Sequence, residues 1–441
     1  MFHLGWFLGN GYGIQPWNRT GRGGAWNSTN GRDWMKPDLY IDLARSLERG
    51  GFDFILIEDT SMIEDTFGGS METTLKYGIM APKNDPLPLV PLMTAATKHI
   101  GIIPTISTTQ YPPFMAARLM TTLDHLTEGR VGINVVTSVS HRVAQNFGHD
   151  KHFEHDLRYE MAGEWMDVVD QLWESWEPDA VLLDEENFVY ADHTKVHTID
   201  YDGTYFKSRG PLNTIPGPQR RPVVSQAGNS IPGRELAART ADTMLAYGGD
   251  VAKMKEFRED MHRRMEKYGR APEELKIMFL VNPIIGETDA DAHEREATRA
   301  AAAATDDAVI QRLWAMSYVS GGEVDFAAMD LDAPIPGVTG NGEQSSMANY
   351  VRAGQGKTLR ELAATHRTIS HMGLVGSCET VAEKMGEIMD EVGGDGFLLY
   401  PTMNRRTIIE IADGLGSALQ RRGLIRESYT GTTLRDHLSE F

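Results

Sequence analysis

The stretch TTLDHLTEGRVGINVVTS at residues 121–138 decides the fold class, because an apolar strand in it ends in a cluster of polar side chains. The predicted strand runs from Val131 to Val136, and Asn134, Thr137 and Ser138 are polar where a buried strand should be apolar. A buried polar group without a partner costs about 1–3 kcal/mol, so we expect these side chains to meet a ligand or a neighbouring loop. This construction is typical of the active-site rim of an α/β protein.

Seven further apolar runs lie outside this strand, at 2–8, 52–57, 101–107, 222–226, 243–247, 277–285 and 396–400. Amphipathic stretches separate most of them, for example 37–50, 87–99, 252–268 and 379–392. Eight strands that alternate with helices predict an α/β protein of the (β/α)8 TIM-barrel type, in a single domain over residues 1–441. A doubly wound open sheet has the same periodicity and stays open as the alternative.

Three segments interrupt the repeat: a Gly/Trp-rich loop at 9–36, an acidic and aromatic stretch at 177–221, and a Gly/Ala/Asp-rich region at 305–365. Loops this long inside a compact domain are usually functional or disordered. We expect them to be insertions at the C-terminal face of the barrel, and the composition of the third is typical of a mobile loop.

The charge balance argues against nucleic-acid and membrane partners. There are 43 basic and 62 acidic residues, and the formal net charge of −19 opposes attraction to phosphates or anionic lipids. The chain offers neither a cationic leader nor 18 consecutive apolar residues, so a cytoplasmic protein is expected. The single cysteine, Cys378, excludes intramolecular disulfides and cysteine-rich metal sites.

The strongest local motif is SQAGNSIPGRELAAR at 225–239, where a strand is followed by Gly228, Ser230 and an early helical Pro232. Free N–H groups at such a helix start, with Arg234 nearby, form a phosphate-sized anion site. An ordinary N-cap by Ser230, which needs no ligand, is the alternative.

Asp59 follows the second strand in FDFILIEDTS, beside Glu58. At this edge of a barrel a carboxylate can hold ribityl or ribose hydroxyls, although capping of a loop amide is an equal alternative.

Three histidines in FGHDKHFEHD, at 149, 152 and 155, have a spacing that could suggest metal, but no compact zinc geometry follows, and we predict no metal site. His155 and Tyr159 are four residues apart at the start of a predicted helix and share a face. A donor and a phenol on one face suit a phosphate or a flavin edge.

Other catalytic motifs are missing or lack their context. GNGYG at 9–13 follows a strand, but the next residues, IQPWNRTGRGGAW, cannot form the helix that a dinucleotide fingerprint requires. The chain contains no GxSxG, Walker or HExxH sequence, so hydrolase templates gain no support.

Several segments together resemble one known family, in order and with similar spacing. They are GGFDFILIEDTS (50–61), NDPLPLVPLMTAATKHIGIIPTIST (84–108), YPPFMAARLMTTLDHLTEGRVGINVVTS (111–138), NFGHDKHFEHDLRYEMAGEWMDVVDQLWESW (146–176), PQRRPVVSQAGNSIPGRELAAR (218–239) and SYTGTTLRDHL (428–438). The family is the bacterial-luciferase-like flavin monooxygenases, and the group within it includes nitrilotriacetate, EDTA, dibenzothiophene-sulfone and long-chain alkane monooxygenases.

The resemblance implies a TIM barrel that uses reduced FMN (FMNH2), supplied by a separate NAD(P)H:FMN reductase, and O2. Oxygen then adds to the flavin as a C4a-(hydro)peroxide and oxidises a small organic substrate, by C–N or C–S cleavage or by hydroxylation. The group usually forms homodimers or homotetramers. Two rivals stay open: a deazaflavin-dependent oxidoreductase on the same barrel, and a non-catalytic flavin-binding protein.

The resemblance also implies which residues contact the flavin: Asp59, Thr105, Asn134, His155, Tyr159, Ala227, Gly228 and Ser230. Gly228, Ser230 and Tyr159 would bind the phosphate, and Asp59, Thr105 and Asn134 would border the ring and ribityl chain. The group often has tryptophan where this chain has Ile133, and the first loop lacks the histidine of sulfone-cleaving members. A sulfone substrate is therefore in doubt.

Substrate-side candidates are placed near the barrel mouth by the strand order. They are Gln15, Trp17, Glu58, Tyr111, Ser138, Tyr247 and His371. His371, in ISHMGLVGS, is the first candidate for a polar or acid/base contact, and a core histidine bonded to the backbone is its alternative.

Overall fold

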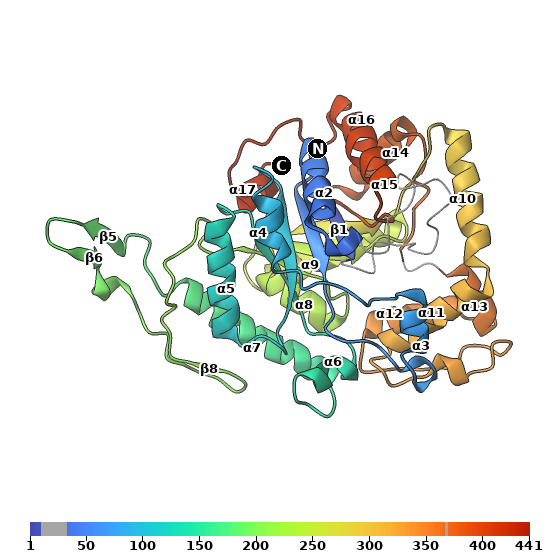
Figure 1. Ribbon diagram of the computed structural model, residues 1–441, viewed down its shortest axis with the longest axis horizontal. Helices are drawn as coiled ribbons and strands as arrows, with labels where there is room; N and C mark the ends of the chain where they lie inside the picture. Colours follow the sequence, from blue (N-terminus) through green and yellow to red (C-terminus); the bar gives the residue numbers. More distant parts are fainter. Residues whose placement is uncertain (10–32, 367–368) are drawn as a thin grey trace.

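A computed structural model describes residues 1–9, 33–366 and 369–441 and shows a closed barrel of parallel strands (Figure 1). The barrel strands are β1 (His3–Gly9), β2 (Phe54–Glu58), β3 (Gly101–Ser107), β4 (Gly132–Val136), β9 (Val223–Gln226), β10 (Thr243–Tyr247), β11 (Lys276–Val281) and β14 (Gly396–Leu399). Each pairs with the next in chain order, and β1 pairs with β14 to close the ring. The predicted TIM barrel is confirmed, and the open-sheet alternative is wrong.

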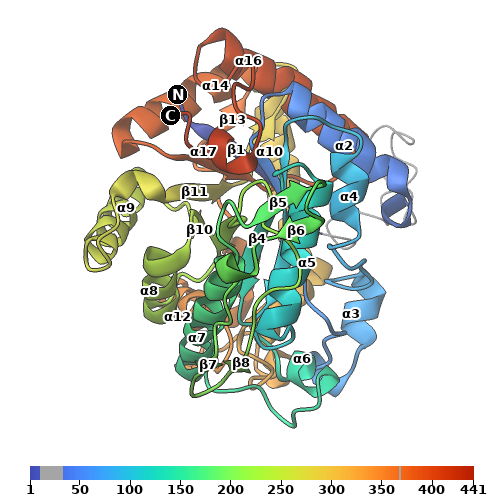
Figure 2. The same cartoon turned by 90° about the vertical axis from the view of Figure 1, so that its left-hand side faces the viewer.

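Helices surround the strands on all sides (Figure 2). They include α2 (Pro37–Arg49), α4 (Leu89–Thr94), α5 (Pro113–Leu126), α7 (His155–Trp173), α8 (Ile231–Thr240), α9 (Val251–Glu266), α10 (Asp289–Ala303) and α14 (Cys378–Val392). The predicted helices at 37–50, 252–268 and 379–392 match α2, α9 and α14 closely, whereas only 89–94 of the stretch 87–99 is helical.

Both faces of each barrel strand are buried, as expected for an all-parallel sheet. In β2, Ile55 and Ile57 pack against the surrounding helices, while Phe54 and Leu56 point into the barrel. The short helix α17 (Leu434–Leu438) joins the interior cluster, and a Cβ on Gly101 would lie 2.5 Å from Leu434. The amino-terminal end of the barrel is therefore plugged by the end of the chain.

The apolar run at 277–285 is not one strand. β11 ends at Val281, and β12 (Ile284–Ile285) pairs instead with β13 (Val375–Gly376) in a separate small sheet. Pro283 lies between the two strands and has no N–H to donate to a continued ladder.

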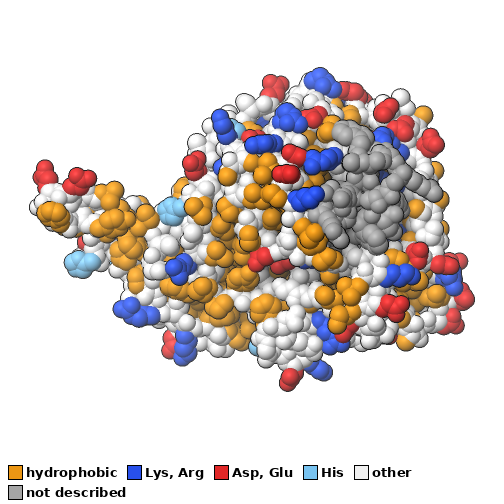
Figure 3. All heavy atoms as spheres, viewed as in Figure 1, with side chains coloured by type: hydrophobic (Ala, Val, Ile, Leu, Met, Phe, Trp, Pro, Cys, Tyr) orange, Lys and Arg blue, Asp and Glu red, His pale blue; other side chains and the backbone are white. Residues whose placement is uncertain are grey.

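The segment 177–221 is not at the C-terminal face by connectivity, so this part of the prediction is wrong. It follows helix α7 and precedes strand β9, and it therefore leads into the amino-terminal end of the barrel. It contains two hairpins: β5 (Val181–Asp184) with β6 (Val189–Ala191), and β7 (Tyr201–Asp202) with β8 (Lys207–Ser208). The β5–β6 hairpin projects from the barrel and carries exposed apolar side chains, with Phe188 at 94% exposure (Figures 1 and 3).

The region 305–365 is largely helical, so the expectation of a mobile loop is not met. It forms α11 (Asp306–Val319), α12 (Gln344–Ala353) and α13 (Leu359–Thr365) around their own apolar cluster. Buried Trp314 donates from Nε1 to Thr74 Oγ1 of α3 (Glu72–Tyr77) at 2.7 Å. Most of the first predicted insertion, 10–32, lies outside the described residues. In the described ranges, no helix has the length and apolarity that a membrane crossing requires.

Candidate functional site

A cavity of about 340 Å³ opens at the carboxyl ends of the barrel strands. Its wall combines strand ends from the barrel with residues of α7, the start of α8, and α11 and α12. We call the helices α11, α12 and α13 of the region 305–365 the 305–365 layer. The carboxyl ends of the barrel strands are the edge at which TIM-barrel enzymes place their active sites.

One end of the cavity lies at the amino terminus of α8. Ser230 caps this helix, accepting from the Gly233 N–H at 3.3 Å, and it lines the cavity at the same time. Gly228 is packed closely, since an added Cβ would lie 2.5 Å from the Tyr159 hydroxyl and 2.6 Å from Gln226 Nε2. Ala227 lines the same wall. The capping alternative is thus correct for Ser230, and it coexists with a place in the cavity wall.

Tyr159 reaches this end of the cavity from α7. Burial raises the pKa of Tyr159, while hydrogen bonds with the side chains of Ser230 and Thr137 oppose the rise. The phenol is therefore protonated at neutral pH.

Arg234 does not contribute to the cavity wall, contrary to the sequence prediction. Its guanidinium donates to the Asn229 carbonyl at 3.0 Å and to Asp260 at 2.9 Å, and it lies 4.4 Å from the centre of the Phe257 ring. These contacts fix the outer face of α8.

Thr105 and Asn134 form a buried pair across β3 and β4. Thr105 Oγ1 donates to the Ile57 carbonyl at 2.7 Å and accepts from Asn134 Nδ2 at 2.8 Å. Asn134 Oδ1 is buried and has no hydrogen-bond partner among the described residues. Both residues line the cavity, so the polar strand positions are partly satisfied by a neighbouring strand and leave one acceptor open.

Asp59 and Glu58 line the cavity at the end of β2. Burial, together with the charges of Glu58 and Asp85, raises the pKa of Asp59 to about 7, although Lys83 opposes the rise. Glu58 is held in an ion pair with Lys83, at 2.9 Å and 3.0 Å from Nζ.

The three histidines of 147–156 do not converge. His155 lines the cavity, its ring centre is 5.1 Å from that of Tyr159, and burial lowers its pKa. His152 Nε2 is 2.9 Å from the Thr137 carbonyl, and burial together with Arg158 lowers its pKa to about 3. The described ranges hold no group of three or more His, Cys, Asp or Glu that could bind a metal ion.

Three of the predicted substrate-side residues, Glu58, Ser138 and Tyr247, line the cavity. Ser138 has a positive φ of 58°, and its Oγ lies 2.8 Å from Ser107 Oγ and accepts from Gln110 Nε2 at 2.9 Å. Burial raises the pKa of Tyr247, and a hydrogen bond with Ser346 opposes the rise.

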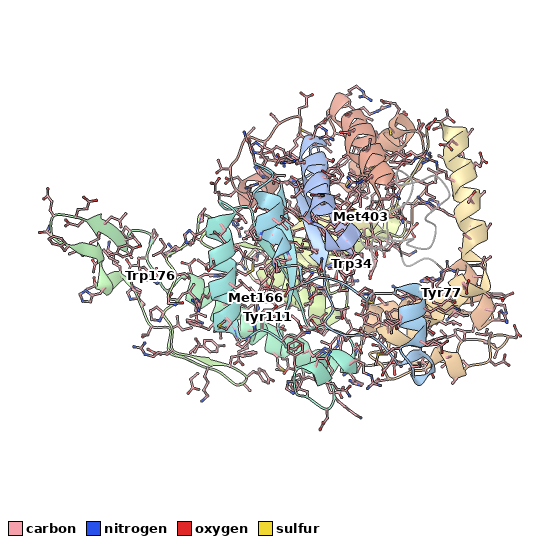
Figure 4. All side chains as sticks on the ribbon, viewed as in Figure 1. Trp34, Tyr77, Tyr111, Met166, Trp176 and Met403 are labelled. Atoms are coloured by element: carbon pink, nitrogen blue, oxygen red, sulfur yellow. The ribbon has the colours of Figure 1, made fainter. Side chains whose placement is uncertain are left out.

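Two further substrate-side candidates, His371 and Tyr111, do not line the cavity. His371 Nε2 is 3.3 Å from Glu296 of α10, and its Nδ1 accepts from the Gly373 N–H, so the ring turns toward the outer helices and not into the cavity. Tyr111 lies where α5 meets α7 (Figure 4), and its carbonyl accepts from Trp165 Nε1 at 2.7 Å. Gln15 and Trp17 lie outside the described residues.

Several lining residues were not predicted from the sequence: Phe7, Arg158, Gln226, Tyr318, Glu343, Ser346 and Tyr400. The helical spacing that pairs His155 with Tyr159 could have indicated Arg158 between them. Nothing in the local pattern around Glu343 distinguishes it from a surface residue.

Comparisons with known proteins point to one family. The sequence profile of the luciferase-like monooxygenases matches residues 17–396. Dibenzothiophene-sulfone monooxygenase of Rhodococcus erythropolis (strain XP) is 34% identical, with 99% of this chain and 96% of that protein covered. Nitrilotriacetate monooxygenase component A of Aminobacter aminovorans is 35% identical, with coverages of 94% and 93%.

A solved structure has the same fold at similar length. The crystal structure of riboflavin lyase with modified FMN and its substrate riboflavin aligns with a TM-score of 0.87 at 28% identity, covering 100% of this chain and 96% of that chain. The chain therefore belongs to the luciferase-like monooxygenases, a family of flavin-dependent oxygenases.

Proposed function

We propose that this protein is the oxygenase component of a two-component, FMNH2-dependent monooxygenase that transfers one oxygen atom from O2 to a small organic substrate. The oxidation would cleave a C–N or C–S bond or hydroxylate a carbon. Both relatives reported above are named monooxygenases, but the substrates in their names differ.

The observation that carries the proposal is a helix amino terminus that opens onto a cavity whose described wall holds one buried acceptor without a partner. The positive end of the α8 helix dipole, the hydroxyls of Ser230 and Tyr159, and the closely packed backbone at Gly228 suit a phosphate. Asn134 Oδ1 has no described partner and could accept from a donor on the flavin ring or ribityl chain. The residues present therefore fit FMN.

When bound, reduced FMN supplies the electrons that activate O2. The protein binds it, orients it and excludes water. Tyr159, protonated at neutral pH, can donate to a phosphate oxygen. The apolar side chains of Phe7, Leu245 and Leu280 in the cavity wall favour a dry environment for the reacting atoms.

A separate NAD(P)H:FMN reductase would supply the reduced flavin. The relative named component A supports a protein that works with a second component. We also propose a homodimer or homotetramer, in line with the resemblance.

The test of the phosphate assignment is Ser230→Asp, titrated with FMNH2 under anaerobic conditions. Aspartate is as good an N-cap as serine, so stability should hold, while its charge repels phosphate. We expect affinity for FMNH2 to fall about tenfold or more, since tenfold corresponds to about 1.4 kcal/mol. Thr288→Asp, at the exposed N-cap of α10, is the matched control and should leave the affinity unchanged.

Unchanged affinity in Ser230→Asp, with thermal unfolding like that of the wild type, would show that the phosphate lies elsewhere. Oxygen uptake with FMN, NADH, a flavin reductase and a substrate panel tests the reaction. Tight binding of a deazaflavin in place of FMNH2 would overturn the proposed function.

A further inference from the structure

One carboxyl group of the cavity is not used by the flavin assignment. Glu343 is the N-cap residue of α12 in the 305–365 layer, and it lines the cavity. Its Oε2 accepts from Ser346 Oγ at 2.7 Å. No described residue donates a hydrogen bond to Oε1, which is therefore available to a ligand.

Tyrosine side chains line the same cavity as Glu343. Tyr247 at the end of β10 and Tyr318 of α11 both line the cavity, and the charge of Glu343 acts on both hydroxyl groups. Tyr318 is fixed by stacking on Trp314, with ring centres 5.8 Å apart and planes at 11°. Aromatic faces attract organic cations, and a carboxylate in the same cavity adds a charged acceptor for an ammonium group.

The charges of the described wall favour the same kind of ligand. Carboxyl groups of Glu58, Asp59 and Glu343 line the cavity. The lining cation Arg158 donates from its two terminal nitrogens to the backbone carbonyls of Phe153 and Asn341 at 2.7 Å each, and its buried Nε has no hydrogen-bond partner among the described residues. The ion pair of Lys83 with Glu58 neutralises one carboxylate and leaves no net positive charge there.

Ionising the Glu343 carboxyl group without a cation beside it costs free energy. Burial raises its pKa, and the charge of Glu58 adds to the rise, while the bond from Ser346 opposes it. A buried carboxylate with one weak partner is stabilised when a cation and its hydrogen bond are supplied. A bound ammonium group would provide both.

We propose that Glu343, together with the rings of Tyr247 and Tyr318, is a subsite for the protonated amine of the substrate, and that this site selects amines over carboxylates. The inference rests on the proposed function for the oxidation of that substrate, but binding is measurable without turnover. An enzyme built for polycarboxylates would need several cations at this wall, whereas the described lining holds one arginine, Arg158, which is 1% exposed, against the carboxyl groups of Glu58, Asp59 and Glu343.

The experiment is isothermal titration calorimetry with three probes of similar shape: benzylamine, benzyl alcohol and benzoate. The protein is loaded with FMNH2 under anaerobic conditions. We expect benzylamine to bind about tenfold or more tightly than benzyl alcohol, and benzoate to bind most weakly, because a charge-assisted hydrogen bond is lost or reversed. Glu343→Gln should remove the preference, whereas Glu185→Gln, exposed at the tip of β5–β6, should keep it.

Equal binding of the three probes to the wild type, or a preference for benzylamine that survives in Glu343→Gln, would overturn the proposal. Glu343→Ala is the second variant in case Glu343→Gln does not fold. It removes the carboxylate, so it should lose the preference for benzylamine, and a preference that persists there would count against Glu343. Failure of FMNH2 to bind concerns the proposed function alone, and the same titrations are then run on the flavin-free protein.

Discussion

At the scale of single residues, Asp59 stands out because its carboxyl group is only partly ionised near neutral pH in the folded protein. Burial and the charges of Glu58 and Asp85 raise its pKa from 3.8 to about 7. Between these two values the folded state binds more protons than the unfolded state, so stability falls as pH rises. The stabilisation is complete below about pH 4 and is lost as the pH passes about 7.

The corresponding prediction compares Asp59→Asn with the wild type in urea unfolding at several pH values. Asparagine resembles the neutral acid and does not ionise, so the variant should gain stability relative to the wild type between about pH 5 and pH 8. Asp390→Asn, exposed on α14, should follow the wild-type profile. If the profiles of Asp59→Asn and the wild type are parallel, Asp59 is ionised throughout this range.

The sequence alone could predict which residues line the cavity only where a strand end or a helix start fixes the direction of the side chain. Asn134 and Ser138 follow from the end of β4, and Ser230 follows from the start of α8. Glu343 and His371 could not be placed, because their surroundings depend on which helices pack together. The position of His371 depends on Glu296 of α10, and Glu343 lines the cavity only because α11 and α12 cover the barrel mouth.

At the scale of elements, the apolar runs predicted the eight barrel strands, but their count left the open sheet as an alternative, and the run at 277–285 holds both β11 and β12. The helical layer at 305–365 was missed because its glycines, which disfavour helices, lie between its helices and gave the whole segment the composition of a loop. Its cluster, which includes Leu313, Met316 and Met347, forms only when three helices meet. Such long-range packing leaves no local periodic signal over the whole segment.

Arg158 connects two of these elements and carries the next prediction. Its side chain is 1% exposed, and it donates from α7 to the carbonyls of Phe153 and Asn341 at 2.7 Å and of Gly342 at 3.4 Å. Burial lowers its pKa to about 10, so it stays charged at neutral pH. These bonds hold the segment that precedes Glu343 against the barrel.

Arg158→Met should lower the free energy of unfolding by about 3 kcal/mol, because buried carbonyls lose their donors. Urea unfolding measures the change. Arg45→Met, which removes an exposed arginine of α2, should change stability by no more than about 0.5 kcal/mol. A similarly small loss in Arg158→Met would mean that water replaces the guanidinium and that α7 does not anchor the layer.

At the scale of the whole molecule, the two ends of the barrel have separate tasks. Asp53 precedes β2 and Asp59 follows it, so the two carboxyl groups lie at opposite ends of a strand roughly 17 Å long. Arg426 and His3 contact Asp53, and the Leu4 N–H donates to it at 2.8 Å. In TIM barrels generally, residues at the amino-terminal end contribute to stability and residues at the carboxyl end of the strands carry out the chemistry.

The buried cluster at the amino-terminal end should therefore be separable from the flavin site. Arg426 and Asp53 are each 1% exposed, and Arg426 also donates to the His437 carbonyl at 2.9 Å, which ties α17 to the barrel. Burial alone would raise the pKa of Asp53, but His3 and Arg426 lower it overall, so this stabilisation is lost as pH falls through that lowered value.

Arg426→Met should cost about 3–5 kcal/mol of unfolding free energy, since it leaves Asp53 buried without its arginine partner. Below the unfolding transition, FMNH2 affinity should match the wild type, because the change lies at the opposite end of the barrel from Ser230 and Asn134. Arg421→Met, at an exposed position, serves as the control for both measurements. Weaker flavin binding in folded Arg426→Met would show that the plug at the amino-terminal end also sets the shape of the cavity.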